Sequence, residues 1–360
     1  MKFIPGLKLS ERFFTKAVRP LIKKHFPDLS YASARLGWGS DVIGFDTPMS
    51  MDHGWGPQLT VFLSENDHEK YGKPLDELFA NNLPFTIAGF PTHFDEPLSD
   101  GGVMAHKLTY PIRHKVEVTT VARFFEAYLG INIYRPLTSN IWLTIPQQRL
   151  RTLHDGRIFH DDTGLLTEQR AKFHWYPHDL WLYLLANQWR RIDQDGPFIG
   201  RTGSVGDVIG ARLLAARLVR EIMRLSFLME RQYAPYAKWF GSAFQQLALA
   251  PGLSPIFIQI LDARKWQDIE ALLSKAYVII GTTHNALKIT PEVDPEVTPF
   301  YNRPFLVPKA DRYVKILLNQ IQDPAVKELP PHLGNVDQFV DHTDILDDIN
   351  CIRKLQPLFQ

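Results

Sequence analysis

The chain has 360 residues, a length typical of two domains or one large domain. Its residues are 45% hydrophobic and 22% charged, so it can bury a sizeable core and lacks the composition of a disordered protein. With 40 basic and 39 acidic residues the formal net charge is +1, which disfavours a long nucleic acid as the partner. No charge-free apolar stretch reaches the roughly 18 residues of a membrane span. The single cysteine, Cys351, excludes an internal disulfide and favours a cytoplasmic location.

The first 150 residues mix short strand-like runs with glycine- and proline-rich turns. An amphipathic helix is expected over residues 9–26, with Ser10 as its cap. The strand-like runs are 60–63, 83–88, 115–121 and 131–134. The run 115–121 alternates best, because Val116 and Val118 fall on one face and Glu117 on the other.

Beyond this part the pattern becomes helical. The Asp155–Gly156 pair predicts a β-hairpin over residues 149–166. Asp207 is expected to cap a long helix over 208–233, and the proline-rich residues 288–309 predict an extended connection. The other expected helices are 177–192, 255–262, 264–287, 310–322 and 344–356. The pattern therefore predicts an α/β domain at 1–148, followed at 149–360 by the hairpin and a helical domain.

The densest group of chemically distinctive residues lies within 36–63. Glycines such as Gly39 let a backbone approach a phosphate closely, and Ser40 adds a hydroxyl donor. The carboxylates of Asp41 and Asp52 are the type of ligand that holds a divalent cation against phosphates. Two interpretations are open, since a phosphate-binding site and an ordinary glycine-rich loop both use these residue types.

The order Gly39–Ser40, eleven residues, then Asp52 ahead of a strand resembles the signature of the nucleotidyltransferase superfamily. The stretch around Glu117 resembles the Lys-Val-Glu-Val strand that carries the third carboxylate in aminoglycoside nucleotidyltransferases. This resemblance implies an α+β fold, with a nucleotidyltransferase-type mixed sheet and flanking helices followed by a mainly α-helical domain. It also implies that Gly39 and Ser40 bind a nucleoside triphosphate.

The chain also resembles the uncharacterised bacterial family DUF4037. The stretches that carry this resemblance are GSDVIGFDTPMSMDHGWGPQL, YPHDLWLYLLANQWRRI, the segment from Gly206 to Phe244, and NRPF at 302–305. The family implies the nucleotidyltransferase fold and names no substrate.

The sequence departs from the superfamily pattern at Gly54, where the second metal-binding carboxylate is expected. Asp52 and Glu117 are expected to bind Mg²⁺, with Asp41 as a substitute ligand from the loop. Asp52 could instead cap a turn, and Glu117 could be an ordinary polar residue on an exposed strand face. Weakened metal binding would leave a domain that binds a nucleotide without transferring it.

Two features of the helical part are open to functional and structural interpretations. Tyr236 and Lys238 could stack on a base and contact phosphates, and the alternative is an aromatic helix junction in the core. Arg217, Arg220 and Arg224 share one helix face, together with Arg231. Such a stripe could bind a polyanion, and the interpretation favoured by the sequence is a solvated face.

The leading hypothesis is a magnesium-dependent enzyme that transfers a nucleoside monophosphate from a nucleoside triphosphate to a hydroxyl acceptor. Asp52 and Glu117 would be its catalytic residues, and the expected acceptor is a small molecule. The alternatives are a nucleotide-binding or regulatory module with weakened catalysis, and a protein-interaction partner in a two-protein module.

Overall fold

The structure is a computed structural model that describes residues 2–95 and 101–360. The chain divides into two compact units, each with its own core. The first unit comprises Met1–Pro136 and Arg149–His174, and the second comprises Leu137–Gln148 and Trp175–Gln360. Residues 149–174, expected at the start of the helical domain, therefore belong to the first unit.

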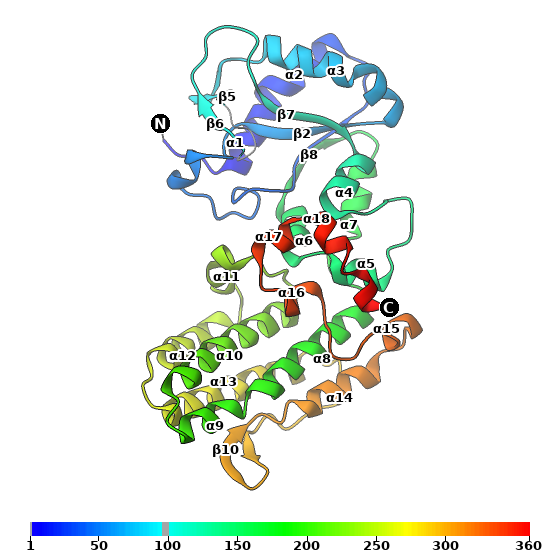
Figure 1. Ribbon diagram of the computed structural model, residues 1–360. Helices are drawn as coiled ribbons and strands as arrows, with labels where there is room; N and C mark the ends of the chain where they lie inside the picture. The colour runs from blue at the N-terminus through cyan, green and yellow to red at the C-terminus, as the bar shows by residue number, and fades with distance from the viewer. Residues whose placement is uncertain (1, 96–100) are drawn as a thin grey trace. The chain divides into compact units, whose positions relative to one another are not determined.

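The first unit is built on a four-stranded mixed sheet in the order β7-β2-β1-β8 (Figure 1). Its strands are β1 (Ala32–Arg35), β2 (Gln58–Leu63), β7 (Lys115–Thr120) and β8 (Arg157–Asp161). β2 and β7 are parallel, whereas β1 pairs antiparallel with both β2 and β8. A parallel pair needs a long crossover, and helix α3 (Glu65–Asn82) lies within the one that joins β2 to β7.

Helices cover the apolar face of this sheet. Leu59, Val61 and Leu63 alternate along β2 and are buried in one core with Val116 of β7. Phe13, from the N-terminal helical segment, packs into the same core. The remaining elements of this unit are α1 (Gly6–Phe13), a π-helical turn (Phe14–Val18), α2 (Arg19–His25), η2 (Pro48–Asp52), α4 (Val121–Leu129), α6 (Gln147–Asp155) from Arg149 onward, α7 (Leu165–Ala171), β3 (Thr86–Ile87), β4 (Phe90–Pro91), β5 (His93–Asp95) and β6 (Val103–Ala105).

The hairpin predicted over residues 149–166 is wrong. Residues up to Asp155 form helix α6, because Leu150 and Leu153 repeat at helical spacing and both are fully buried. Gly156 does not form a hairpin turn, and its role is to allow a close backbone approach. A Cβ there would lie 2.6 Å from the carbonyl oxygen of Arg35, so glycine lets β8 start close to the end of β1.

Three other sequence expectations need correction. The first helix begins at Gly6 rather than near Ser10, which lies inside it. No strand forms over 131–134, where the Asn132 side chain accepts a hydrogen bond from the Tyr134 N–H at 2.9 Å and closes a turn. The run 83–88 supplies only the two-residue strand Thr86–Ile87.

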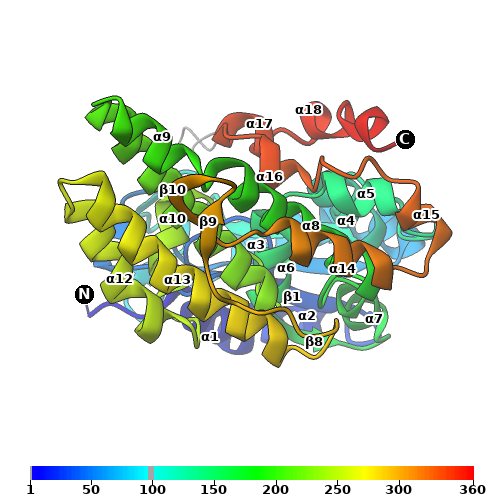
Figure 2. The ribbon, with the colours of Figure 1, turned by 90° about the horizontal axis from the view of Figure 1, so that it is seen from below.

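The second unit is mainly helical, and Figures 1 and 2 show its long helices side by side. Helix α8 packs against both α10 and α14, and α10 also packs against α12 and α13. Its helices are α5 (Ser139–Thr144), α8 (His178–Asp195), α9 (Phe198–Ser204), α10 (Val208–Met229), α11 (Ala237–Phe244), α12 (Ala250–Asp262), α13 (Trp266–Ala286), α14 (Asp311–Gln320), α15 (Pro324–Lys327), α16 (Val336–Phe339), α17 (Thr343–Asp347), α18 (Ile349–Arg353) and η4 (Gln356–Phe359).

The local signals in this unit are mostly confirmed. Asp207 caps α10 by accepting a hydrogen bond from the Gly210 N–H at 2.8 Å. The extended connection contains a two-stranded ribbon of β9 (Thr298–Phe300) and β10 (Arg303–Val307). Together the two units confirm the predicted α+β class, with a mixed sheet and flanking helices and a mainly helical second part. In the described part of the chain, no helix combines the length and apolar character that a bilayer crossing requires.

Candidate functional site

The polar face of the sheet follows from the strand alternation. In the β2–β7 ladder Thr60 lies opposite Glu117, and Gln58 lies opposite Lys115. Successive side chains point to opposite faces of a sheet, so these four side chains share the face opposite the apolar core. Helix α4 follows β7 directly, and its start is fixed by Thr120, whose hydroxyl accepts a hydrogen bond from the Arg123 N–H.

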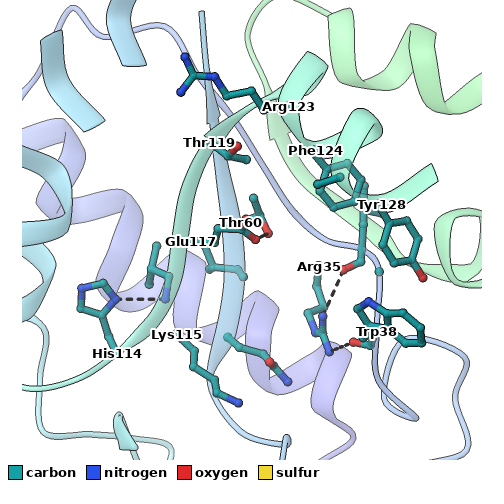
Figure 3. Close-up of a pocket in the computed structure, with 16 residues that line it drawn as sticks. Arg35, Trp38, Thr60, His114, Lys115, Glu117, Thr119, Arg123, Phe124 and Tyr128 are labelled. Carbon is teal, nitrogen blue, oxygen red and sulfur yellow. Dashed lines mark hydrogen bonds between the residues drawn. The ribbon is translucent and has the colours of Figure 1, made fainter. Parts of the chain in front are cut away.

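A cavity of about 590 Å³ lies over this polar face (Figure 3). Its walls come from the end of β1 and the following loop, from β2 and β7, and from α4. The lining residues are Arg35, Leu36, Gly37, Trp38, Gln58, Leu59, Thr60, His114, Lys115, Val116, Glu117, Thr119, Arg123, Phe124, Ala127 and Tyr128. Its size is in the range of small-molecule sites.

Glu117 provides the negative charge of this cavity. Among the described residues that line it, Glu117 is the only aspartate or glutamate. The Thr60 hydroxyl donates to Glu117 Oε2 at 3.4 Å, which leaves most of the hydrogen-bonding capacity of the carboxylate available. The exposed carboxylate can therefore bind a cation or accept a proton.

Lys115, two residues earlier on the same face, provides a positive charge. Its Nζ lies 4.7 Å from the centre of the Phe94 ring. Burial lowers the pKa of Lys115 to about 8, and the positive charge of Arg35 lowers it further while Asp41 opposes the shift. At neutral pH the ammonium is still mostly charged, so it can contact a phosphate.

An aromatic wall completes the cavity on the side of α4. The Trp38 and Tyr128 rings meet edge to face at 5.8 Å, and Phe124 stacks on Tyr128 at 5.6 Å. The Arg149 guanidinium lies 4.8 Å from the Trp38 ring. Trp38 is 45% exposed, so this wall offers an open aromatic surface against which a planar ring can stack.

The predicted phosphate-binding pair, Gly39 and Ser40, lies in the loop beyond Trp38 and does not line this cavity. The loop is held by Asp41, which accepts two hydrogen bonds of 2.8 Å from Nε and Nη2 of Arg35. Gly39 has φ +136°, and a Cβ there would lie 2.0 Å from Asp41 Oδ1, so this position requires glycine.

The other predicted metal ligands are also placed apart. Asp41 is 2% exposed, and both of its carboxylate oxygens are occupied by Arg35. Asp52 ends the helical turn η2 and lies outside the lining of the cavity. Its Oδ1 accepts a hydrogen bond from the His53 N–H at 2.9 Å, and the side chain is 62% exposed. Within residues 2–95 and 101–360, no three His, Cys, Asp or Glu side chains are grouped to hold a metal ion.

Tyr236 and Lys238 belong to the second unit. The Tyr236 N–H donates to Gln148 Oε1 at 3.0 Å, immediately before α11. The exposed Lys238 places its Nζ 5.0 Å from the Trp239 ring. Nearby Tyr233 is 3% exposed and packs against Trp175, which matches the alternative of an aromatic junction in the core.

Sequence reasoning missed several cavity residues. Lys115 has a signal in the sequence, because it lies two positions before Glu117 on the alternating strand. Trp38 and Tyr128 have no such signal. They meet through the packing of α4 against the end of β1, which a single sequence does not reveal.

Comparison with protein families supports part of the predicted resemblance. Residues 142–240 match the family model described as "Domain of unknown function (DUF4037)". The predicted DUF4037 resemblance is confirmed over this segment. It includes α8 and α10, whereas the glycine-rich stretch at 39–59 and the NRPF stretch lie outside the match.

The structure is also similar to the crystal structure of a nucleotidyltransferase-like protein from Exiguobacterium sibiricum. The two chains are 13% identical, with a TM-score of 0.34, and the similarity covers 79% of this chain and 82% of the other. No curated protein matches the sequence. Neither the family nor the similar structure names a substrate.

Proposed function

We propose that the cavity over the polar face of the sheet binds a nucleoside triphosphate, and that the chain transfers its nucleoside monophosphate to a hydroxyl of a small molecule. The observation that carries this proposal is the placement of Glu117 and Lys115 side by side below an open aromatic wall. Nucleotide transfer uses three kinds of group. An aromatic surface stacks on the base, a cation contacts the phosphates, and a carboxylate holds a metal ion or accepts a proton.

In the proposed reaction the acceptor oxygen attacks the α-phosphorus, and the bond from that phosphorus to the bridging oxygen breaks. Pyrophosphate leaves, and the hydroxyl proton passes to a base. Lys115 contacts the phosphates, and Trp38 stacks on the base. Glu117 either accepts the proton or holds a metal ion.

The proposal includes Mg²⁺, held by fewer protein carboxylates than the sequence predicted. Protein sites often hold Mg²⁺ through one or two carboxylates together with the phosphates of the substrate. Glu117 fits that arrangement, since its carboxylate is exposed in the cavity. A bound ion would neutralise phosphate charge there. The predicted roles of Asp52, Ser40 and Lys238 stay predictions.

The structure also gives a reason to retain the second hypothesis, a nucleotide-binding module with weakened catalysis. Gly54 occupies the position of the second carboxylate, and the substitute Asp41 is paired with Arg35. With Glu117 as the cavity's carboxylate, the protein would supply few metal ligands, and the phosphates of the nucleotide would have to supply the rest. If the metal ion is then bound too weakly for catalysis, the chain would bind a nucleotide without transferring it.

A thermal-shift experiment with the four nucleoside triphosphates, each with and without Mg²⁺, tests the proposal. Ligand at 100 times its Kd stabilises the folded state by about 2.7 kcal/mol. We expect one nucleotide to raise the Tm of the wild type in the presence of Mg²⁺. Glu117→Gln should lose the magnesium-dependent part if Glu117 holds the ion, and should keep it but lose transfer if Glu117 is the base.

The matched control is Glu69→Gln, which makes the same change on the exposed surface of α3. It should behave as the wild type. If no nucleotide changes the Tm of the wild type, or if Glu117→Gln matches Glu69→Gln both in the Tm shift and in nucleotide transfer, the cavity is not the proposed site. The protein-interaction hypothesis would then take its place.

A further inference from the structure

A second cavity, of about 320 Å³, lies within the helical unit and is rich in arginine. We call it the arginine cavity. It is formed by α8, α10 and the segment that contains α16, and its lining residues are Arg191, Arg217, Arg220, Glu221, Arg224, Asp337, Gln338, Phe339, Val340 and Asp341. Arg217, Arg220 and Arg224 belong to the arginine stripe for which the sequence pattern favours a solvated helix face.

One wall of the arginine cavity is a fixed ion pair. Arg191 donates from Nε and Nη2 to the two oxygens of Glu221, each at 2.8 Å. Glu221 is 3% exposed and also accepts a hydrogen bond from Gln188 at 2.6 Å. Removing either partner of such a buried pair would leave an uncompensated charge, so these two residues are structural.

A second ion pair of the arginine cavity is more exposed than the first. Arg220 donates two hydrogen bonds to Asp341, at 2.6 and 2.8 Å, but the Asp341 side chain is 76% exposed. Exposed pairs of this kind contribute about 0–1 kcal/mol. An anion that enters the cavity can therefore replace Asp341 as the partner of Arg220 at little cost.

Arg224 follows Arg220 by about one turn of α10. Its Nη1 donates to the backbone oxygen of Asp337, and burial lowers its pKa. In the described part of the chain, no Asp or Glu oxygen lies within 4.0 Å of its guanidinium nitrogens. The charges of Asp337 and Glu221 act on Arg224 from a greater distance, and its guanidinium retains further N–H donors for a phosphate.

The carboxylates around the arginine cavity balance its arginines, so an anion has to replace one of them. Arg217 is paired with Asp195, just outside the lining, at 2.8 Å, and the other three arginines lie near the carboxylates of Glu221, Asp337 and Asp341. Burial raises the pKa of Asp337, whereas the positive charge of Arg224 opposes the shift. Asp341 is the carboxylate most open to replacement, because its side chain is the most exposed of those paired with these arginines.

We propose that the arginine cavity binds a small phosphorylated molecule through its phosphate, which is held by Arg220 and Arg224. Planar guanidinium groups bind phosphate oxygens in bidentate fashion, and a phosphate dianion matches two cations better than a single carboxylate does. The volume leaves room for a small organic group beyond the phosphate. This proposal is independent of the nucleotide site, because all residues of the arginine cavity belong to the second unit.

Isothermal titration calorimetry of the full chain tests the proposal, with inorganic phosphate and ribose 5-phosphate as probes at constant ionic strength set by KCl. We expect both to bind, and ribose 5-phosphate to bind more tightly if the natural ligand carries an organic group. Arg220→Gln should weaken binding at least about tenfold, since it removes a charge-assisted hydrogen-bonding pair. Asp341→Asn should strengthen binding severalfold, because it releases Arg220 and removes a competing negative charge.

The matched control is Arg212→Gln, which removes the same charge from an exposed position on α10 outside the arginine cavity. It should bind both probes as the wild type does. Arg224→Met provides a second test of the cavity, with circular dichroism to verify its fold. Absence of binding by either probe in the wild type would overturn the proposal, and so would equal binding by Arg220→Gln and Arg212→Gln.

Discussion

Lys115 and Glu117 show how one alternating strand can bring opposite charges to the same face without pairing them. Their side chains are separated by two positions on β7, and each lies opposite a polar residue of β2. The ammonium lies over the Phe94 ring rather than against a carboxylate. Among the residues that the structure describes, no carboxylate pairs with Lys115, and a phosphate is the natural candidate for that role.

The lowered pKa of Lys115 gives a pH prediction. A lysine with a pKa of about 8 is charged below that pH and neutral above it, so its contribution to phosphate binding is present at pH 7 and lost as the pH rises. We expect the affinity for the nucleotide that binds best to fall about tenfold between pH 7 and 9.5. Calorimetric titration at several pH values measures this change.

The corresponding variant is Lys115→Met, which should bind weakly at all pH values and lose most of the pH dependence. Lys73→Met, at an exposed position on α3, is the control and should retain the wild-type profile. A wild-type affinity that stays constant across this range would show that Lys115 does not contact the phosphates.

At the scale of elements, the loop between β1 and β2 carries the predicted phosphate-binding signature but does not supply those residues to the cavity. Gly39, Ser40 and Asp41 were predicted together as phosphate and metal ligands. In the structure Asp41 instead closes the loop onto Arg35, and Gly39 allows the close approach. The same residue types serve a folded loop and a phosphate site, so the composition alone could not separate the two.

This arrangement predicts that Asp41 is structural. Asp41→Asn removes one partner of a buried ion pair, and we expect the free energy of unfolding to fall by about 3–5 kcal/mol. Urea denaturation, with and without Mg²⁺, measures the change, which should not depend on the metal. Asp28→Asn, at an exposed site, should be nearly neutral. Full stability of Asp41→Asn with loss of magnesium-dependent nucleotide binding would support the metal role instead.

Elements with a strong local signal were predictable, and elements set by tertiary pairing were not. β7 and α10 were expected near their observed bounds, because alternation and a capping aspartate act within a few residues. The error at Asp155–Gly156 has a different origin. The glycine is required by the approach of β8 to β1, and these strands are more than a hundred residues apart in sequence.

At the scale of the whole molecule, the order of the two units along the chain determines where a fragment that contains the first unit can end. The sheet of the first unit needs β8, which lies after a segment that belongs to the second unit. The boundary expected at residue 148 therefore separates β8 from its partner β1. Without β8, β1 would present unpaired N–H and C=O groups as an exposed sheet edge.

A pair of fragments tests this division. We expect residues 1–174 to form a soluble protein with a cooperative thermal transition, because they contain all four strands of the mixed sheet. Residues 1–148 lack β8 and α7, so they should aggregate or unfold without a clear transition. Soluble yield and circular dichroism melting curves compare the two under the same conditions. A cooperative transition of equal midpoint in both fragments would show that β8 is dispensable, and would move the boundary of the first unit back to residue 148.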